Sequence, residues 1–374
     1  MAICGDIKKM FHQILIRGQD RSAQLFLWRD KPNLPITTMV ADVAIFGASC
    51  SPAHSQNVKN KNATDFQEDH PPAAAAIHKK HYVEDYLDSK DTVDEAVAIA
   101  SEGNRFERLL GMAWFPEKDC FKFFLSIGEY LAKLVKGELV PNKREVLVMS
   151  IFDPLGLVAA FIVYGKILKQ DVWRAKVVWN DRIPNNVYCR WSQWLRVLQR
   201  MVNVEIPRCY FPGYQPISYE TLELHIFVDA SELACAATVY FRIIDNGFIR
   251  CALVSSKTNV APLLPLSIPR LELIAAVLGA RLRKTVEEGH SLKVKRTCFW
   301  SDSTTVLAWI NSDLRRYRQF VAFTVAEILN LSTAEEWRWV LTKLNVADEA
   351  TKWGKGPCFE ANSRWYQGPI FFVR

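Results

Sequence analysis

Four acidic residues in the last third of the chain have the spacing of a carboxylate cluster. They lie in the segments Ile226-Phe-Val-Asp229, Pro269-Arg-Leu-Glu272, Trp300-Ser-Asp302 and Asn345-Val-Ala-Asp348. Two of these acids follow strand-like apolar runs, one lies in the first turn of an expected helix, and one comes just after the last apolar run. A sheet gathers such carboxylates at one edge, where they can bind two divalent ions for phosphodiester hydrolysis.

Each acid by itself is more simply explained as a surface charge, because the chain contains 40 acidic residues. All four in suitable elements, and in this order, are a much rarer coincidence. Their hard oxygen ligands favour Mg²⁺ or Mn²⁺ over zinc. One ion would activate a water molecule and the other would stabilise the leaving oxygen, at a separation of about 3.5–4 Å.

The elements that must position these acids can be read from hydrophobic periodicity. A buried strand is expected at Leu224–Val228, and an Asp-Asn-Gly turn at 245–247 joins two further strands in a hairpin. A helix begins near Ser267, and its small residues Ala276 and Gly279 lie on the strip of Glu272, which allows close packing. The remaining elements are a strand at 297–300, a helix at 304–310, a strand at 338–341 and a helix from Val346. This order predicts a mixed α/β sheet with helices on both faces.

A second acidic set lies near the N-terminus. Asp6 ends an apolar strand that begins at Ala2, and helical spacing follows over 7–16. Glu84 and Asp85 lie at the tip of a hairpin expected over 81–87, after a helix over 51–63. These acids have the arrangement of a two-metal site for nucleotidyl transfer. Two ordinary acidic turns would explain the same spacing equally well.

The chain divides into three expected regions. Residues 1–127 form an α+β region, residues 128–220 are rich in tryptophan and helical patterning, and residues 221–374 form the mixed sheet. Two helices are expected in the middle region, at 167–179 and 191–201, with their tryptophans in the core. A proline-rich stretch at 207–216 is a plausible linker.

The composition is that of a globular protein, with 49% hydrophobic and 23% charged residues among 374. No apolar run is long enough to span a bilayer, and no secretory signal is present. Nine scattered cysteines without a CxxC pair predict reduced thiols in an intracellular protein, with cytoplasm and nucleus both open.

The net charge of +7 permits a polyanionic partner without requiring one. Basic residues cluster at 281–284, 293–296 and 315–318. Each cluster alone is readily explained as a solvated face. Three clusters within the segment of the four acids favour phosphate contacts. The preferred phosphate-binding candidates are Arg281, Arg283, Lys284, Arg315, Arg316 and Arg318.

Nearly the whole chain resembles the reverse transcriptase and ribonuclease H portions of a Pao/BEL-type retrotransposon polyprotein. The motifs that carry the resemblance are Gly5-Asp6-Ile-Lys-Lys-Met-Phe11, Phe46-Gly-Ala-Ser-Cys-Ser-Pro52, Tyr82-Val-Glu84-Asp85, Ser150-Ile-Phe-Asp-Pro-Leu-Gly156 and the four acidic segments above. The 150–156 motif resembles the entry to the segment that is often labelled a Pao-type peptidase.

This resemblance implies a partial polymerase palm over 1–127, a helical connection over 128–220 and a ribonuclease H-like domain over 221–374. Asp229, Glu272, Asp302 and Asp348 would be the metal-binding catalytic tetrad of the ribonuclease H. Asp6, Glu84 and Asp85 would be the polymerase acids, with Asp6 and Asp85 as metal ligands and Phe11 beneath the nucleotide sugar. The implied substrate is RNA paired with DNA, read by duplex shape and 2′-hydroxyls rather than by base edges.

Three departures from the family pattern predict that polymerase activity is absent or vestigial. The chain starts at the first palm motif, so the fingers are missing. Glu84 is one methylene longer than the aspartate of the family, and a misplacement of ~1 Å can cost about 100-fold in rate. The stretch between Asp94 and Gly111 is also shorter than expected.

Two other functions compete with metal-dependent hydrolysis of RNA in hybrids. A catalytically dead remnant could still bind nucleic acid. An aspartic peptidase would need two aspartates in Asp-Thr/Ser-Gly turns that share a proton. The segment Val228-Asp229-Ala230-Ser231 lacks the glycine and has no second copy.

Overall fold

In the computed structural model, the chain forms two compact units, Met1–Leu109 and Leu110–Arg374. The three regions expected from the sequence, with boundaries at 127 and 220, stay a prediction. The structure describes residues 2–6, 10–31, 33–45, 48, 50–69, 71–82, 85–89, 107–109, 112–115, 117–123, 133, 136, 140–143, 146, 153–201, 204–211, 221–245, 248–353, 358, 360, 362–372.

The first unit contains a small antiparallel sheet and two helices. Its strands β1 (Ala2–Asp6), β5 (Asp85–Ser89) and β4 (His81–Tyr82) lie in that order, and β4 and β5 form the expected hairpin. The other elements are α1 (Ser51–Asp65), α2 (Pro71–Lys80), the hairpin of β2 (Leu25–Trp28) and β3 (Thr37–Val40), β6 (Glu107–Leu109), and the 3-10 helices η1 (Met10–Gln13) and η2 (Gly18–Gln24).

The helix expected over 7–16 is only the short η1 among the described residues. Backbone pairing explains the difference, because Ile16 N donates to Asp42 O at 2.8 Å and Ala44 N donates to Ile14 O at 2.9 Å. These bonds use the N–H of Ile16 and the carbonyl of Ile14 in a strand-like pairing with residues 42–44. Phe11, the second residue of η1, is buried.

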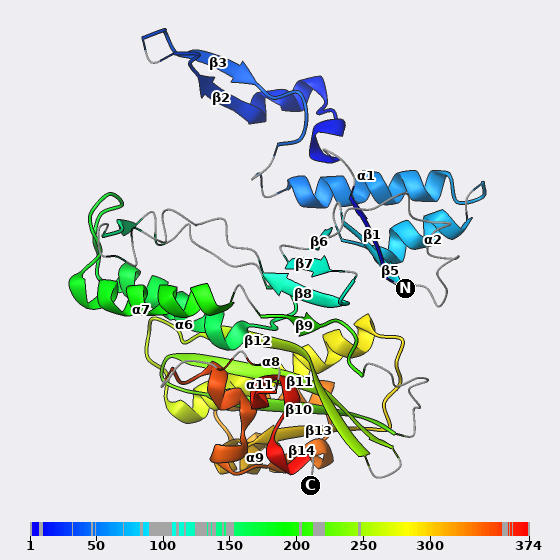
Figure 1. The fold of residues 1–374 in the computed structure, drawn as a ribbon, viewed down its shortest axis with the longest axis vertical. Coiled ribbons are helices and arrows are strands. Elements are labelled where there is room, and N and C mark those ends of the chain that lie inside the picture. The colour runs from blue at the N-terminus through cyan, green and yellow to red at the C-terminus, as the bar shows by residue number, and fades with distance from the viewer. Residues whose placement is uncertain are drawn as a thin grey trace. The chain divides into compact units, whose positions relative to one another are not determined.

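The second unit is built on a five-stranded sheet in the order β12-β11-β10-β13-β14 (Figure 1). Its strands are β10 (Leu222–Ala230), β11 (Ala234–Asp245), β12 (Phe248–Val260), β13 (Arg296–Ser301) and β14 (Trp337–Trp339). The first three strands are antiparallel, whereas β13 is parallel to β10 and β14 is parallel to β13. The mixed sheet expected from the sequence is confirmed.

Helices cover both faces of this sheet. On one face, α8 (Ile268–Gly289), α9 (Thr304–Ile310) and α10 (Gln319–Leu331) share a core with Ile226 and Val228. On the other face, α6 (Ala159–Arg174), α7 (Asn185–Met201) and α11 (Arg364–Gln367) share a core with Phe227 and Tyr240. The side chains of Ile226 and Val228 therefore point to one face of the sheet, and that of Phe227 points to the other. Strands β7 (Met112–Phe115), β8 (Cys120–Phe123) and β9 (Ile206–Pro207) pair antiparallel in the same unit.

The two helices expected in the middle region are present as α6 and α7, each beginning several residues earlier than predicted. Trp191 and Trp194 are buried as expected, while Trp173 and Trp179 are each about half exposed. Helix α10 was not predicted. The last expected helix is the short 3-10 turn η6 (Val346–Ala350). The other 3-10 turns are η3 (Leu314–Arg316), η4 (Ala334–Glu336), η5 (Thr342–Leu344) and η7 (Ile370–Phe372).

The segment Asp153-Pro-Leu-Gly156 attaches α6 to strand β12. Both carboxylate oxygens of Asp153 accept backbone N–H groups at the start of the helix, at 2.9 Å each. Ser256 N donates to Leu155 O at 2.9 Å, and Ser256 Oγ donates to the carbonyl of Gly156. Gly156 has a φ of +74°, and a side chain there would overlap the backbone of Ser256. Residues 150–152 of this motif lie outside the described residues.

A buried ion network lies at the start of β10. Glu223 accepts hydrogen bonds from Arg242 Nη1 and Arg296 Nε, both at 2.7 Å. Trp300 Nε1 donates to His225 Nδ1 at 3.0 Å, so His225 Nε2 carries the proton and donates to Glu223 at 3.2 Å. Burial by itself raises the pKa of Glu223, but these three hydrogen bonds outweigh it and lower the pKa to about 2.

No helix in the described part of the chain is long and apolar enough to cross a membrane.

Candidate active site

Asp229 and Asp302 lie at the carboxyl ends of two neighbouring parallel strands. Phe227 of β10 is paired with Trp300 of β13, and each aspartate comes two residues further along. The shared register therefore brings the two carboxylates to the same end of the sheet. In sheets of this kind, ligands bind outside the carboxyl ends of the strands.

Glu272 reaches the same end of the sheet because α8 packs very closely on β10. A Cβ atom at Gly279 would lie 2.5 Å from Val228 Cγ1, so only glycine fits at this crossing. The close packing expected from the small residues of this strip is confirmed. Ser303 Oγ donates to Glu272 Oε2 at 2.5 Å, which ties the glutamate to the residue after Asp302.

Asp348 is brought to the cluster by the buried side chain of Asn345. Asn345 Nδ2 donates to the carbonyl of Val228 at 2.9 Å and to Asp302 Oδ1 at 3.2 Å. Its Oδ1 accepts the N–H of Ala347 at 3.2 Å, which caps the turn η6. One amide thus joins the ends of both strands to the turn that carries Asp348.

Two residues after this turn also contact the acids. Thr351 Oγ1 donates to Asp229 Oδ2, and its carbonyl accepts Ser231 Oγ at 2.8 Å. Lys352 Nζ forms an ion pair with Asp348 Oδ1, four residues earlier. These contacts were not predicted from the sequence. The four-residue spacing of Asp348 and Lys352, which is that of an ion pair on a helical turn, was the available signal.

The four carboxylates interact electrostatically. Burial raises the pKa of Asp229 to about 7, and the nearby charges of Asp302 and Asp348 add to the increase. Burial also raises the pKa of Glu272, with a further contribution from Asp302, while the hydrogen bond from Ser303 opposes it. Like charges held together out of water are stabilised by a cation, so the donor set has the chemistry of a divalent-ion site.

The positions of the side chains differ from those of a formed metal site. Among the described residues, no three His, Cys, Asp or Glu side chains are close enough to share one ion. Lys352 supplies the cationic partner of Asp348 instead. The carboxylates therefore fit the ion in chemistry and in placement on the sheet, while coordination requires Asp348 to leave its lysine.

The candidate phosphate-binding residues separate into two groups. On α8, Arg281 bonds Glu327 at 2.6 Å, Arg283 bonds Glu287 at 2.8 Å, and Lys284 lies 3.7 Å from Glu288. Arg315, Arg316 and Arg318 are exposed around η3, which follows α9, and the described residues include no ion-pair partner for them. The three arginines around η3 are therefore the candidates whose positive charge is not already paired with an acid among the described residues, so they can bind a polyanion.

The polymerase acids are described only through their backbone. Asp6 of β1 is paired with Asp85 of β5 in the antiparallel sheet, so the two residues lie opposite each other. Glu84 lies outside the described residues. The side chains of Asp6 and Asp85 also lie outside the described part, so their role as metal ligands stays a prediction.

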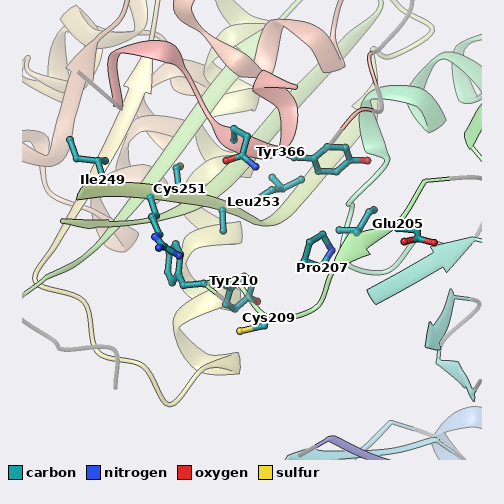
Figure 2. Close-up of a pocket in the computed structure, with 13 residues that line it drawn as sticks. Glu205, Pro207, Cys209, Tyr210, Ile249, Cys251, Leu253 and Tyr366 are labelled. Carbon is teal, nitrogen blue, oxygen red and sulfur yellow. The ribbon is translucent and has the colours of Figure 1, made fainter. Parts of the chain in front are cut away.

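A largely apolar cavity of the second unit is separate from the acids. Figure 2 shows it between the segment with Pro207, Cys209 and Tyr210 and strand β12 with Cys251 and Leu253. Its volume is about 290 Å³, and none of the four acids lines it. The four candidate acids thus lie near the carboxyl ends of the inner strands β10 and β13, and not in this cavity.

Comparisons with known proteins identify part of the chain. Residues 142–303 match the family model described as the Pao retrotransposon-like RNaseH-like domain. A similar solved structure is the N-terminal RNase H domain of a Mycobacterium tuberculosis protein, fused to maltose-binding protein. It is 12% identical, with 35% of this chain and 91% of that chain covered and a TM-score of 0.24. No curated protein matches the chain.

The matched residues include the helices α6, α7 and α8 and the strands β10 to β13, with Asp229, Glu272 and Asp302, whereas Asp348 lies outside the match. RNase H-like domains generally bind nucleic acid and use divalent metal ions. Residues 142–303 are therefore similar to the Pao retrotransposon-like RNaseH-like domain.

Proposed function

We propose that this chain hydrolyses the RNA strand of RNA–DNA hybrids, with Asp229, Glu272, Asp302 and Asp348 as its catalytic acids. The observation that carries the proposal is the convergence of all four on one end of the sheet. Asp229 and Asp302 lie at the ends of adjacent parallel strands, Ser303 bonds Glu272, and Asn345 joins Asp302 to the turn that carries Asp348.

In this proposal three of the four acids are each held by a hydrogen bond from a neighbouring side chain. Asp229 is the most buried, and Thr351 fixes one of its oxygens. Asp302 is oriented by Asn345, and Glu272 by Ser303. Two bound divalent ions would supply an activated water and a stabilised leaving oxygen. The side chains contribute negative charge at fixed positions, which is what pre-organises such a site.

The experiment is cleavage of an end-labelled RNA–DNA hybrid by the full chain in Mg²⁺. Asp302→Asn keeps the shape of the side chain and removes its charge, so we expect cleavage to fall to the level of buffer alone. Asp65→Asn is the matched control, because Asp65 is an exposed acid of α1 paired only with Lys61 among the described residues. Full activity in the Asp302 variant would refute the site assignment. An inactive wild-type chain that still binds the hybrid would favour a catalytically dead binding protein.

We also propose that polymerase activity is absent or vestigial. The backbone pairing of Asp6 with Asp85 supports a palm-like origin for the first unit. Glu84 carries one methylene more than the aspartate of the family pattern, which displaces its carboxylate by ~1 Å and can cost about 100-fold in rate. Primer extension on poly(rA)–oligo(dT) is the test, and robust incorporation of nucleotides would refute this proposal.

A further inference from the structure

The start of helix α10 lies beside the turn of α8 that carries Glu272. Two contacts show that these helices run in the same direction. Near their starts, the guanidinium of Arg270 lies 5.3 Å from the ring centroid of Phe320. Further along both helices, Arg283 Nη1 donates to the carbonyl of Leu331 at 2.9 Å. The first residues of α10 are therefore at the end of the sheet where the candidate acids lie.

Two phenylalanine rings of α10 are exposed at this end. Phe320 is 38% exposed and Phe323 is 66% exposed, and their spacing of three residues places them on one side of the helix. The core contacts of α10 are made by other residues, such as Val325 and Ile328, which are fully buried. Single exposed apolar residues are normal, whereas neighbouring exposed apolar groups mark a site of interaction.

Positive charge surrounds the two rings. Arg315, Arg316 and Arg318 are exposed in and just after the turn η3, which precedes α10. In the part of the chain that the structure describes, neither these arginines nor Arg270 has an ion-pair partner. The acid beside this turn is Asp313, and its carboxylate accepts the backbone N–H of Arg315 at 3.0 Å. The four arginines and two rings are called the aromatic–arginine surface, which consists of Arg270, Arg315, Arg316, Arg318, Phe320 and Phe323.

Aromatic packing attaches the turn η3 to the strand end that carries Asp302. Tyr317 packs edge-on against Trp309 of α9, with ring centroids 6.2 Å apart, and η3 contacts α10. Helix α9 begins at Thr304, two residues after Asp302, and is 7 residues long. At 1.5 Å per residue it spans roughly 10 Å, which is about three nucleotides of one strand at ~3.4 Å each. A strand held at the acids therefore reaches this surface within a few nucleotides.

We propose that the aromatic–arginine surface binds an unpaired stretch of nucleic acid that continues from the hybrid held at the acids. This inference rests on the proposed function. Unpaired bases stack on exposed aromatic rings while arginines bind the phosphates, which holds a single strand with little sequence preference. The base faces of a duplex are covered by neighbouring base pairs, so a hybrid alone would leave both phenylalanines unused. The arginines without acidic partners favour a polyanion over a protein as the occupant.

The test compares the binding of two fluorescent RNA–DNA hybrids to the full chain, measured by anisotropy in EDTA. One hybrid is blunt, and the other carries a single-stranded extension of about ten nucleotides, placed at each end of each strand in turn. We expect the wild-type chain to bind an extended hybrid more tightly than the blunt one. Phe323→Ala should weaken binding of the extended hybrid by about fivefold or more and leave binding of the blunt hybrid unchanged, because it removes one base stack.

The arginines are tested through the salt dependence of the same binding. Each phosphate contact on a single strand contributes about −0.7 to the slope of log affinity against log salt. Arg315→Gln/Arg316→Gln removes two cations, so we expect the slope for the extended hybrid to become shallower by about 1.4. The charge-conserving Arg315→Lys/Arg316→Lys should keep the wild-type slope.

Two variants control for the loss of the ring. Phe323→Tyr keeps an aromatic face and should keep the preference for the extended hybrid. Phe248→Ala makes the same truncation at a ring that is 75% exposed. Phe248 is paired with Asp245 at the end of β11, whereas Asp229 is paired with Ala236 near the start of that strand. This control therefore lies at the other end of the sheet and should bind both hybrids like the wild-type chain. A thermal melt of each variant checks that it is folded.

Equal wild-type affinity for blunt and extended hybrids would overturn this inference, and so would an unchanged slope in the arginine-to-glutamine variant. Equal losses on both hybrids in Phe323→Ala would also overturn it, because the ring would then contact the duplex. If Phe323→Ala leaves both affinities unchanged and converts a dimer to a monomer in sedimentation, the surface is a contact between copies and the inference is wrong. In each of these cases cleavage of the blunt hybrid in Mg²⁺ still tests the proposed function separately.

Discussion

Gly279 fixes the distance between α8 and β10, and therefore the position of Glu272. An alanine Cβ at this position would lie 2.5 Å from Val228 Cγ1 and 3.2 Å from Ile226 Cγ2. Both neighbours are β-branched side chains in a closed core, so neither can turn away without strain. We predict that Gly279→Ala destabilises the sheet and the candidate site together.

The magnitude follows from two opposing effects. Alanine is favoured over glycine within a helix by about 1 kcal/mol. Overpacking a core by one methyl group costs about 1–3 kcal/mol, and the short contact with Val228 places this case near the upper end. The net expectation is a destabilisation of about 1–2 kcal/mol.

Hydrogen exchange of the full chain is the assay, read from peptides that cover α8 and β10. It reports the stability of this packing without requiring the two units to unfold together. Gly289→Ala is the matched control, because Gly289 ends the same helix and nothing lies within 4 Å of an added Cβ. We expect the control to exchange at the wild-type rate or more slowly.

Combining Gly279→Ala with Val228→Ala tests the cause directly. Removing the valine methyl groups makes room for the alanine, so the double variant should be more stable than the sum of the two single effects predicts. Wild-type protection in Gly279→Ala, with wild-type cleavage of the hybrid, would refute the reasoning that this close approach positions Glu272.

Three further predictions concern charges and backbone. Lys352→Met should tighten Mn²⁺ binding by about two- to fivefold in calorimetry, because an exposed ion pair of up to about 1 kcal/mol no longer holds Asp348; weaker binding would contradict it. The pKa of Glu223 is lowered to about 2 in the folded chain, so its stabilisation is present above about pH 4.5 and is lost as the pH falls toward 2. Glu223→Gln should therefore destabilise the chain at pH 7 and flatten its acid denaturation curve, and an unchanged curve would contradict this. Gly156→Ala should cost more than about 2 kcal/mol in a denaturation experiment, because it combines a left-handed φ with overlap on Ser256; a wild-type midpoint would refute it.

The sequence by itself determined the five strands of the main sheet and their order along the chain, together with the helices α8 and α9. The apolar run at 224–228 and the stripe of α8 are local patterns, and both elements are present. The expected turn at 245–247 lies largely outside the described residues, but the strands on either side of it pair antiparallel. The small residue at 279 also indicated a close helix–strand crossing. Local signals of this kind are strong because side-chain direction repeats every two residues in a strand and every 3.6 in a helix.

Some elements were predicted wrongly or not at all because their sequences have weak periodicity or none. The expected helix over 7–16 gives way to pairing with residues 42–44, a contact that no local pattern records. Helix α10 has a long apolar run without a narrow stripe, and the final turn η6 is too short to show a period.

Only the tertiary structure decided what each acid and cation contacts. The sequence could place Asp229 and Asp302 after strands, but the parallel register makes them neighbours. Nothing local indicated that Asn345 would bridge them. These contacts join residues that are tens to more than a hundred positions apart, so they exist only after the chain has packed. The physical reason is that electrostatic interactions depend on distance in space, and the fold alone sets that distance.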